Sequence, residues 1–228
     1  RLHIPTDEAI TRSALLGIMA VREALRSAGV SPKEVPMAFV NGTTVGGMDC
    51  SEQYYLDFLD NDSRNEFIAL HDVGACTRQI AEHIGPFVYQ ASTSTACSSA
   101  ANAIIHAARM LECGEAEMAV AGGTECLTKF HLNGFNSLLI LDNAPCRPFC
   151  KTRAGLNLGE GAAYVVLETP EAAQRRGHQP LAILTGYGNA CDAFHQTATS
   201  ETADGPYLAM RKALEKGRLT AQDIDYVN

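Results

Sequence analysis

Hydrophobic residues near the start of the chain recur with the period of an α-helix. They follow one another at steps of three or four, which places them on one helical face. Thr6 precedes the run as a candidate N-cap, and Gly29 follows it as a candidate stop. We therefore predict an amphipathic helix between these two residues. Its buried face is expected to carry Ile10, Ala14, Ile18, Val21, Leu25 and Ala28.

Short apolar runs alternate with helical patterns through the rest of the chain. The predicted strands cover residues 36–40, 87–91, 117–121, 162–168 and 181–187, and another begins at 224. The predicted helices lie around residues 54–59, 73–84, 97–113, 170–176 and 206–216. This alternation is typical of a layered α/β fold with a mainly parallel sheet. The turn-rich segment 124–160 is too long for a simple connector, so we expect it to be functional or internally structured.

The composition is that of an ordinary folded chain. Its 228 residues have a mass of 24.4 kDa, enough for one large or two small domains. Hydrophobic residues make up 46% and charged residues 19%, which argues against intrinsic disorder. The 18 basic and 26 acidic residues give a net charge of −8, so we expect no nucleic-acid partner. The longest apolar runs are far shorter than the ~20 residues of a membrane span, so we expect no membrane partner.

Eight cysteines are spread along a chain that is long enough to build its own core. Without a signal-peptide-like start, they favour free thiols and a cytoplasmic location over a secreted disulfide framework. Their spacing lacks paired zinc-ligand motifs, so we expect neither a metal nor a cofactor. The Gly-rich segment 155–161 precedes a predicted strand instead of following one, which favours a structural turn over a nucleotide site.

The most informative segment runs from Ala91 to Ala103. A predicted strand ends there, small hydroxylated residues turn the chain, and Cys97 stands where the next helix begins. The unpaired N–H groups and the dipole of a helix start favour a thiolate, and they can stabilise an oxyanion on an acyl group attached to the sulfur. This pattern is typical of a nucleophilic cysteine that accepts an acyl group. A small apolar cysteine packed at a helix start is the alternative, with about equal weight.

Short motifs follow one another in a fixed order along the chain. They read Thr95-Ala-Cys97-Ser-Ser, Val120-Ala-Gly-Gly-Thr-Glu125, Arg147-Pro-Phe149, Gly159-Glu-Gly161, Gly186-Tyr-Gly188, Asp192-Ala-Phe-His195 and Asp225-Tyr-Val-Asn228. Each motif is weak alone, but their order and spacing together resemble the β-ketoacyl-acyl-carrier-protein synthases. These are the condensing enzymes of fatty-acid and polyketide synthesis, built on the thiolase fold.

The resemblance implies a thiolase-like α/β/α fold with a mainly parallel mixed sheet. Residues 1–228 are expected to form the N-terminal domain, incomplete at both ends relative to the family. Cys97 falls on the nucleophile that accepts an acyl chain from an acyl carrier protein, and Thr95 and Phe135 are weaker candidates for substrate binding. A malonyl thioester on the carrier is then decarboxylated, and its carbanion attacks the acyl-cysteine.

The same resemblance implies partners and missing groups. The expected partners are an acyl carrier protein with acyl and malonyl thioesters and a second copy of the chain in a homodimer. The family also uses two histidines and a lysine that are expected beyond the position of Asn228. We therefore expect these 228 residues alone to be inactive in condensation.

Two positions depart from the family pattern. Cys150 and Ala154 stand where the family has acidic residues. This keeps open a non-catalytic companion subunit, similar to a chain length factor, although such companions usually replace the nucleophile. A thiolase-type relative that uses coenzyme A thioesters is a third interpretation. The cations Arg147, Lys151 and Arg153 either contact an acidic carrier protein or are simply solvated.

Overall fold

A four-stranded sheet forms the centre of the first of two compact units. The computed structural model describes residues 9–195 and 197–228, and its contacts divide the chain into units 1–172 and 173–228. In spatial order the strands are β2 (Tyr89–Thr93), β1 (Ala38–Gly42), β3 (Met118–Glu125) and β4 (Gly161–Glu168). β1 pairs in parallel with β2 and β3, and β4 runs antiparallel to β3. This mixed sheet confirms the predicted α/β fold.

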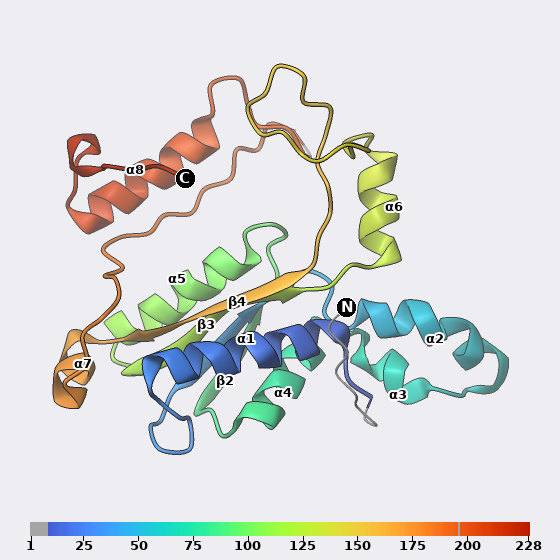
Figure 1. The fold of residues 1–228 in the computed structure, drawn as a ribbon, viewed down its shortest axis with the longest axis horizontal. Helices are drawn as coiled ribbons and strands as arrows, with labels where there is room; N and C mark the ends of the chain where they lie inside the picture. The colour runs from blue at the N-terminus through green and yellow to red at the C-terminus, as the bar shows by residue number, and fades with distance from the viewer. Residues whose placement is uncertain (1–8, 196) are drawn as a thin grey trace. The chain divides into compact units, whose positions relative to one another are not determined.

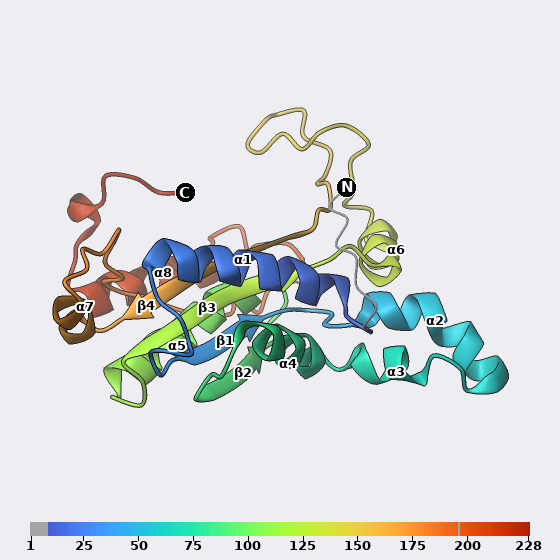
Figure 2. The same cartoon turned by 60° about the horizontal axis from the view of Figure 1, so that its bottom comes forward.

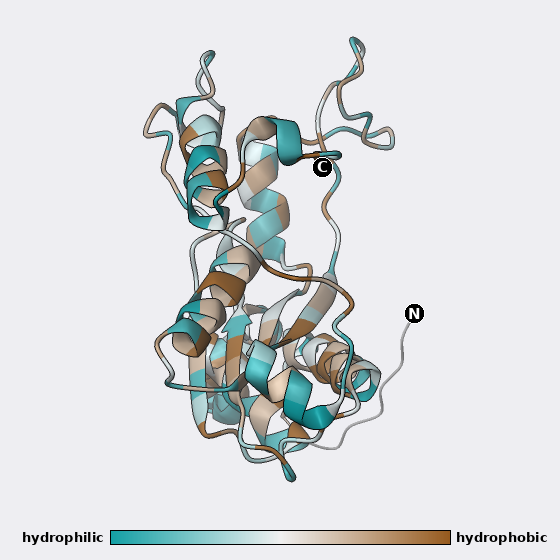
Figure 3. Cartoon of the chain, turned by 90° about the vertical axis from the view of Figure 1, so that its left-hand side faces the viewer, coloured by the Kyte–Doolittle hydropathy of each residue, from teal (hydrophilic) through white to brown (hydrophobic). Residues whose placement is uncertain are grey.

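Helices cover both faces of this sheet (Figures 1 and 2). One face is covered by α1 (Arg12–Ala28) and α4 (Val73–Ile84), and the other by α5 (Ser99–Glu112). The loop after β1 leads into α2 (Met48–Asn61), α3 (Asn65–Ile68) and the 3-10 helix η1 (Ala69–His71). Hydrophobic and hydrophilic bands alternate along the helices (Figure 3), as expected where one side of a helix is buried.

Side chains in and beside β1 alternate between two cores. Met37 and Phe39 belong to the core beneath α1 and α4, whereas Ala38 and Val40 belong to the core beneath α5. All four are fully buried. This is the period of two that a strand imposes. Burying a large side chain such as Phe39 stabilises the fold by roughly 1.5–3 kcal/mol.

Two glycines let the start of α5 approach the ends of β1 and β3. A Cβ atom at Gly42 would lie 2.5 Å from the Ser99 carbonyl carbon and from the Ala100 nitrogen. A Cβ atom at Gly123 would lie 2.7 Å from the Cβ of Ala100. Real Cβ atoms essentially never lie this close to another heavy atom, so these positions require glycine. The N-terminus of α5 is thereby held against the sheet.

The first helix is confirmed, but its predicted start is wrong. Thr6 lies outside the described residues, and α1 begins at Arg12 with Thr11 as its N-cap. The Thr11 hydroxyl accepts a hydrogen bond from the Ala14 N–H at 3.1 Å, so a second threonine satisfies the helix start. Gly29 ends the helix with φ of +63°, as predicted.

The turn-rich segment contains α6 (Lys129–Ser137), which confirms that it has internal structure. The carboxylate of Glu52 accepts hydrogen bonds from the N–H groups of Lys129 and Phe130, at 2.7 and 2.6 Å. A carboxylate at a helix N-terminus also interacts favourably with the helix dipole. α2 therefore anchors the start of α6.

Two predicted strands are wrong. Beyond α7 (Pro170–Arg176), which spans the boundary between the units, the described residues form only α8 (Asp204–Gly217), the 3-10 helix η2 (Ala221–Asp223) and irregular segments. Residues 181–187 and 224–228 form no strand there, because a strand needs a hydrogen-bonded neighbour and this unit offers only a helix. The first of these segments packs on α8 through Gly186, where a Cβ would lie 2.1 Å from the Ala213 carbonyl oxygen.

Among the described residues, no helix has both the length and the apolar character needed to cross a membrane.

Candidate active site

Cys97 lies in a tight turn between the end of β2 and the start of α5. Its side chain is exposed and its thiol is free. The turn residue before it, Ala96, has a left-handed backbone with φ of +52°. The N–H groups of Ser98 and Ser99 donate within the turn, to the carbonyls of Thr95 and Ala96 at 3.3 and 3.0 Å, so Cys97 itself can offer both a nucleophile and its N–H to one bound group.

Ser99 ties this turn together from the inside. Its hydroxyl donates a hydrogen bond to the Ala96 carbonyl at 2.7 Å and accepts one from the Thr95 N–H at 2.9 Å. Its carbonyl accepts a hydrogen bond from the Thr93 hydroxyl at 2.9 Å. With only 4% of its surface exposed, Ser99 makes these contacts away from water.

Thr95 belongs to the same turn and is held by the exposed Ser98 and the half-buried Asn102. Its hydroxyl oxygen accepts hydrogen bonds from the Ser98 hydroxyl at 3.0 Å and the Asn102 amide at 2.8 Å. The structure therefore brings Thr95 together with Cys97. A substrate that bonded to the Thr95 hydroxyl would share it with these groups, and its role in substrate binding stays a prediction.

A second loop reaches the turn from the neighbouring strand. Glu125, at the end of β3, accepts hydrogen bonds from the Thr43 hydroxyl at 3.0 Å and the Thr44 N–H at 2.7 Å. The Thr44 hydroxyl in turn donates to the Ala96 carbonyl at 3.4 Å. The ends of three neighbouring strands thus converge on the residue before Cys97.

Three other cysteines have environments unlike that of Cys97. Cys50, Cys76 and Cys126 are buried, and desolvation raises the pKa of each thiol to about 12. Buried thiols of this kind are protonated and inert at neutral pH. They are therefore packing residues, whereas Cys97 faces solvent.

Phe135, the other predicted substrate-binding residue, lies on α6. Its half-buried ring packs against the ring of His131, with 6.4 Å between centroids. The His131 backbone N–H donates the N-cap hydrogen bond to the Thr128 hydroxyl at 3.2 Å. Phe135 therefore belongs to a different element from the Cys97 turn, and its place beside an acyl chain stays a prediction.

The cationic loop uses its arginines internally. Arg147 donates hydrogen bonds to Asp142 at 3.1 Å and to the Thr152 carbonyl at 2.9 Å, and Arg153 donates to the Cys150 carbonyl at 3.0 Å. The hydrogen bond with the Thr152 side chain, together with the charge of Arg153, lowers the pKa of the Cys150 thiol. These contacts favour a structural role for both arginines over a free basic patch.

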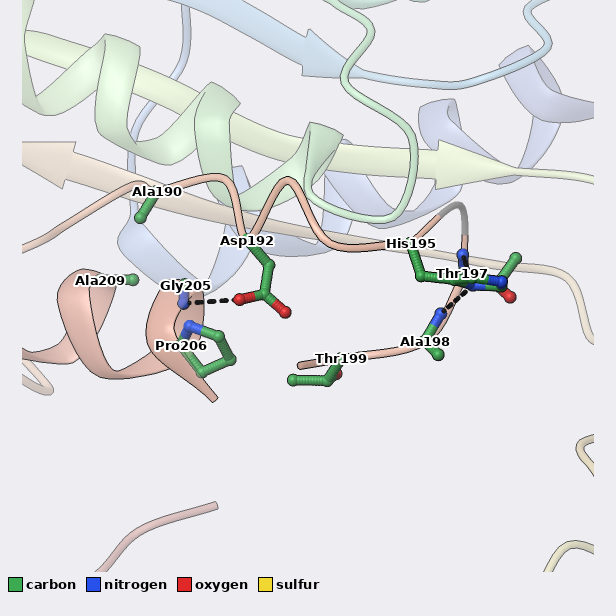
Figure 4. Close-up of a pocket in the computed structure, with 9 residues that line it drawn as sticks. All are labelled: Ala190, Asp192, His195, Thr197, Ala198, Thr199, Gly205, Pro206 and Ala209. Carbon is green, nitrogen blue, oxygen red and sulfur yellow. Dashed lines mark hydrogen bonds between the residues drawn. The ribbon is translucent and has the colours of Figure 1, made fainter. Parts of the chain in front are cut away.

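The second unit contains a shallow pocket of about 290 Å³ around the motif Asp192-Ala-Phe-His195 (Figure 4). The Asp192 carboxylate accepts hydrogen bonds from the Ser200 N–H at 2.6 Å and the Gly205 N–H at 2.9 Å, which lower its pKa. His195 Nδ1 accepts N–H bonds from Thr197 and Ala198, both at 3.1 Å. Nδ1 therefore carries no proton in this arrangement, and the ring offers Nε2–H to the surroundings.

Sequence reasoning located the cysteine but missed the residues that hold it. The sequence pattern places Ser99 only among the small hydroxylated residues of the turn, and it does not connect Thr93, Glu125 or Gly42 to the site. A serine at the first position of a helix after a turn was the available signal, because such hydroxyls often bond to nearby backbone. The contacts of Glu125 and Gly42 depend on sheet order, which no local pattern reports.

The fold and the turn together define a class of protein. It is a layered α/β protein that presents a cysteine thiol between the end of a strand and the start of the next helix. Residues 3–173 match the family model for the β-ketoacyl synthase N-terminal domain, and residues 181–228 match the model for the C-terminal domain. The chain therefore belongs to the β-ketoacyl synthase family. The boundary between the two matches falls close to the boundary between the two compact units.

Individual relatives agree with this assignment. Nodulation protein E of Rhizobium meliloti is 36% identical over 96% of this chain and 56% of its own length. The 3-oxoacyl-[acyl-carrier-protein] synthase 2 of Staphylococcus aureus is 30% identical over 99% of this chain and 60% of its own length. The solved structure of the ishigamide ketosynthase/chain length factor matches with a TM-score of 0.86 and 27% identity, covering 98% of this chain and 57% of that one. The chain thus spans somewhat more than half the length of these relatives.

Proposed function

We propose that this chain carries the acyl-accepting part of a β-ketoacyl-acyl-carrier-protein synthase. The observation that supports this proposal best is the exposed, free thiol of Cys97 in a tight turn at the start of α5. Cys97 Sγ attacks the carbonyl carbon of an acyl thioester, the new S–C bond forms, and the carrier thiol leaves with the proton of the cysteine. The Cys97 N–H stabilises the oxyanion between these steps.

The second half of the reaction consumes the acyl-cysteine. A malonyl thioester loses carbon dioxide, and the resulting carbanion attacks the acyl carbonyl, which releases Cys97 and forms a β-ketoacyl thioester. We infer that the two histidines and the lysine of the family lie in a part of the full-length protein that corresponds to the portion of the relatives not covered by these 228 residues. By themselves the 228 residues are expected to accept an acyl group but not to condense it.

The proposed partners follow from the same reaction. The proposed thioester carrier is an acyl carrier protein, which the 3-oxoacyl-[acyl-carrier-protein] synthase 2 of Staphylococcus aureus has in its name. A second copy of the chain would pair with β2, which lies at the edge of the described sheet and exposes Tyr89. The proposed location is the cytoplasm. Analytical ultracentrifugation of the full-length protein tests for the dimer.

Acyl transfer is tested by mass spectrometry of the full-length protein after incubation with an acyl thioester of an acyl carrier protein. An adduct that maps to Cys97 and is lost in Cys97→Ser is the expected result. Cys113→Ser is the matched control, because Cys113 is also exposed and lies at the other end of α5. Absence of an adduct on Cys97 in the folded wild-type protein contradicts the proposal.

A non-catalytic companion subunit is the second candidate. The replacement of acidic family residues by Cys150 and Ala154 favours it, as does the similarity to a ketosynthase/chain length factor structure. The retained Cys97 argues against it. Release of carbon dioxide from a malonyl thioester by the acylated full-length protein identifies the enzyme, whereas its absence, with restoration by an added active synthase, identifies the companion.

A further inference from the structure

Ser99 contacts the backbone on both sides of Ala96. The serine hydroxyl joins the Thr95 N–H to the Ala96 carbonyl, and the Ser99 N–H also donates to that carbonyl, at 3.0 Å. The Ser99 backbone itself cannot shift toward the sheet, because its carbonyl carbon already lies against Gly42. Ser99, whose backbone is fixed against the sheet, therefore holds the left-handed backbone of Ala96 directly before Cys97.

The neighbouring serine provides a natural comparison. The Ser98 hydroxyl also bonds to the turn, since it donates to the Thr95 carbonyl at 2.8 Å. Ser98 is exposed, however, so water can replace its hydroxyl, whereas Ser99 is buried. Losing a buried hydrogen-bond partner costs more than losing an exposed one, because the remaining groups stay unsatisfied.

We propose that Ser99 is a positioning residue for acyl transfer at Cys97, an inference that rests on the proposed function. During transfer, the thioester carbonyl oxygen gains negative charge as Sγ attacks, and it must then meet the Cys97 N–H. Ser99 fixes the backbone that carries both the sulfur and this donor. Its hydroxyl touches neither the acyl group nor the carrier thiol.

This role predicts a split between two reactions of the same thiol. Acyl transfer needs both the Cys97 sulfur and the Cys97 N–H to be aligned with the thioester carbonyl, whereas alkylation by iodoacetamide builds no oxyanion and needs only an accessible thiol. Loss of the Ser99 hydroxyl therefore slows acylation and leaves alkylation nearly unchanged. A purely structural role would leave the ratio of the two rates unaltered in the folded protein.

The experiment compares wild type, Ser99→Ala and Ser98→Ala in the full-length protein. The probes are the hexanoyl thioester of N-acetylcysteamine and iodoacetamide, and peptide mass spectrometry measures the rate at Cys97. We expect Ser99→Ala to lower the acylation rate by about tenfold or more, since small misplacements cost up to about 10²-fold. Alkylation at Cys97 should change by less than about twofold, and Ser98→Ala should keep both rates within about twofold.

Internal reporters keep the result interpretable. Cys113 is exposed and reports general thiol reactivity, whereas Cys76 is fully buried and becomes alkylated only if the fold opens. If Ser99→Ala exposes Cys76, Thr93→Val is the replacement variant. This isosteric change removes the bonds from the Thr93 hydroxyl to the carbonyls of Ser99 and Asn41, at 2.9 and 3.5 Å, and leaves the Ser99 hydroxyl in place. The expected loss of acylation is then about threefold.

The possible outcomes separate the inference from the proposed function. Acylation at the wild-type rate in Ser99→Ala with Cys76 protected overturns the inference and leaves the proposed function intact. An equal loss in Ser98→Ala also overturns it. If the wild-type protein takes no acyl group at Cys97, the proposed function fails and the role of Ser99 fails with it.

Discussion

Cysteine environments differ sharply within one chain, and this difference is visible at single residues. Desolvation raises the pKa of Cys76 to about 12, and its thiol has no exposed surface. Cys97, by contrast, stands at a helix start with its side chain in solvent. Reactivity toward an added electrophile follows thiolate content and access, so burial alone separates these two thiols.

We therefore predict a selective alkylation pattern in the native protein at neutral pH. Iodoacetamide should label Cys97 at least about tenfold faster than Cys50, Cys76 or Cys126, because the buried thiols are both protonated and inaccessible. Peptide mapping over a time course measures each rate. The same treatment in denaturant provides the control, since all sites should then react alike. Rapid native labelling of Cys76 would contradict the assigned burial.

At the scale of elements, the position of α5 depends on Gly42 and Gly123, which have no side chain where the helix approaches the sheet. Gly42→Ala places a methyl group 2.5 Å from the Ser99 and Ala100 backbones. Because backbone must then move, we predict a loss of about 1–3 kcal/mol in the free energy of unfolding. Denaturant titration followed by circular dichroism measures this change.

The matched control for this substitution is Gly134→Ala. Gly134 lies inside α6, and nothing approaches its missing Cβ within 4 Å. Alanine is favoured over glycine inside a helix by up to about 1 kcal/mol, so this variant should be as stable as wild type or slightly more stable. Equal destabilisation by both substitutions would contradict the close approach of α5 to the sheet.

α1 is tied to the segment before β4 by an ion pair. The Arg12 Nε donates to a Glu160 carboxylate oxygen at 2.8 Å, and this bond lowers the pKa of Glu160. A carboxyl group with a lowered pKa in the folded state stabilises the fold above its unfolded-state pKa and loses this contribution as pH falls. The pair thus links α1 to the Gly159-Glu-Gly161 motif.

Glu160→Gln should accordingly be less stable than wild type at pH 7, by no more than about 1 kcal/mol because both side chains are partly exposed. The difference should shrink as pH falls below about 4.5, the ordinary pKa of the carboxyl group, since the wild-type residue then also becomes neutral. Thermal unfolding at several pH values measures it. A difference that stayed constant down to pH 3 would argue against the ion pair.

For the whole molecule, the two units differ in how much they bury. Both hydrophobic cores belong to the first unit, whereas the segment 181–187 exposes Leu181 by 93% and Ile183 by 79%. Backbone amides exchange slowly where core elements must open globally and rapidly where little is buried. The chain should therefore show strongly uneven protection.

We predict that amides of β1 and β3 exchange slowest and that residues 181–190 exchange orders of magnitude faster in the 228-residue chain. Hydrogen exchange followed by mass spectrometry provides the measurement. Slow exchange across 181–190 would show that this segment pairs as a strand in solution, as its sequence pattern suggests. The amides of α5 serve as an internal reference, because this helix packs on the sheet.

The sequence pattern anticipated features that depend on nearby residues. The apolar run 36–40 and the three- and four-residue steps before Gly29 report local geometry, and the structure has β1 and α1 there. The Cys97 turn was also predictable, because a strand end, small residues and a helix start are adjacent in the chain. The strand predicted at residues 181–187 is absent, because a strand requires a neighbouring strand to pair with and sequence periodicity does not specify one. The hydrogen bond from the Thr44 N–H to Glu125 likewise joins residues 81 positions apart in the sequence, so no local pattern predicts it.

The left-handed backbone of Ala96 has a consequence for how this protein could be engineered. Glycine adopts such a φ without penalty, whereas alanine pays about 1 kcal/mol. Ala96→Gly removes this strain from the folded state but raises the conformational entropy of the unfolded chain by a comparable free energy, so the substitution leaves stability nearly unchanged. A screen for stability alone would therefore not distinguish the two residues, although glycine widens the range of conformations open to the turn.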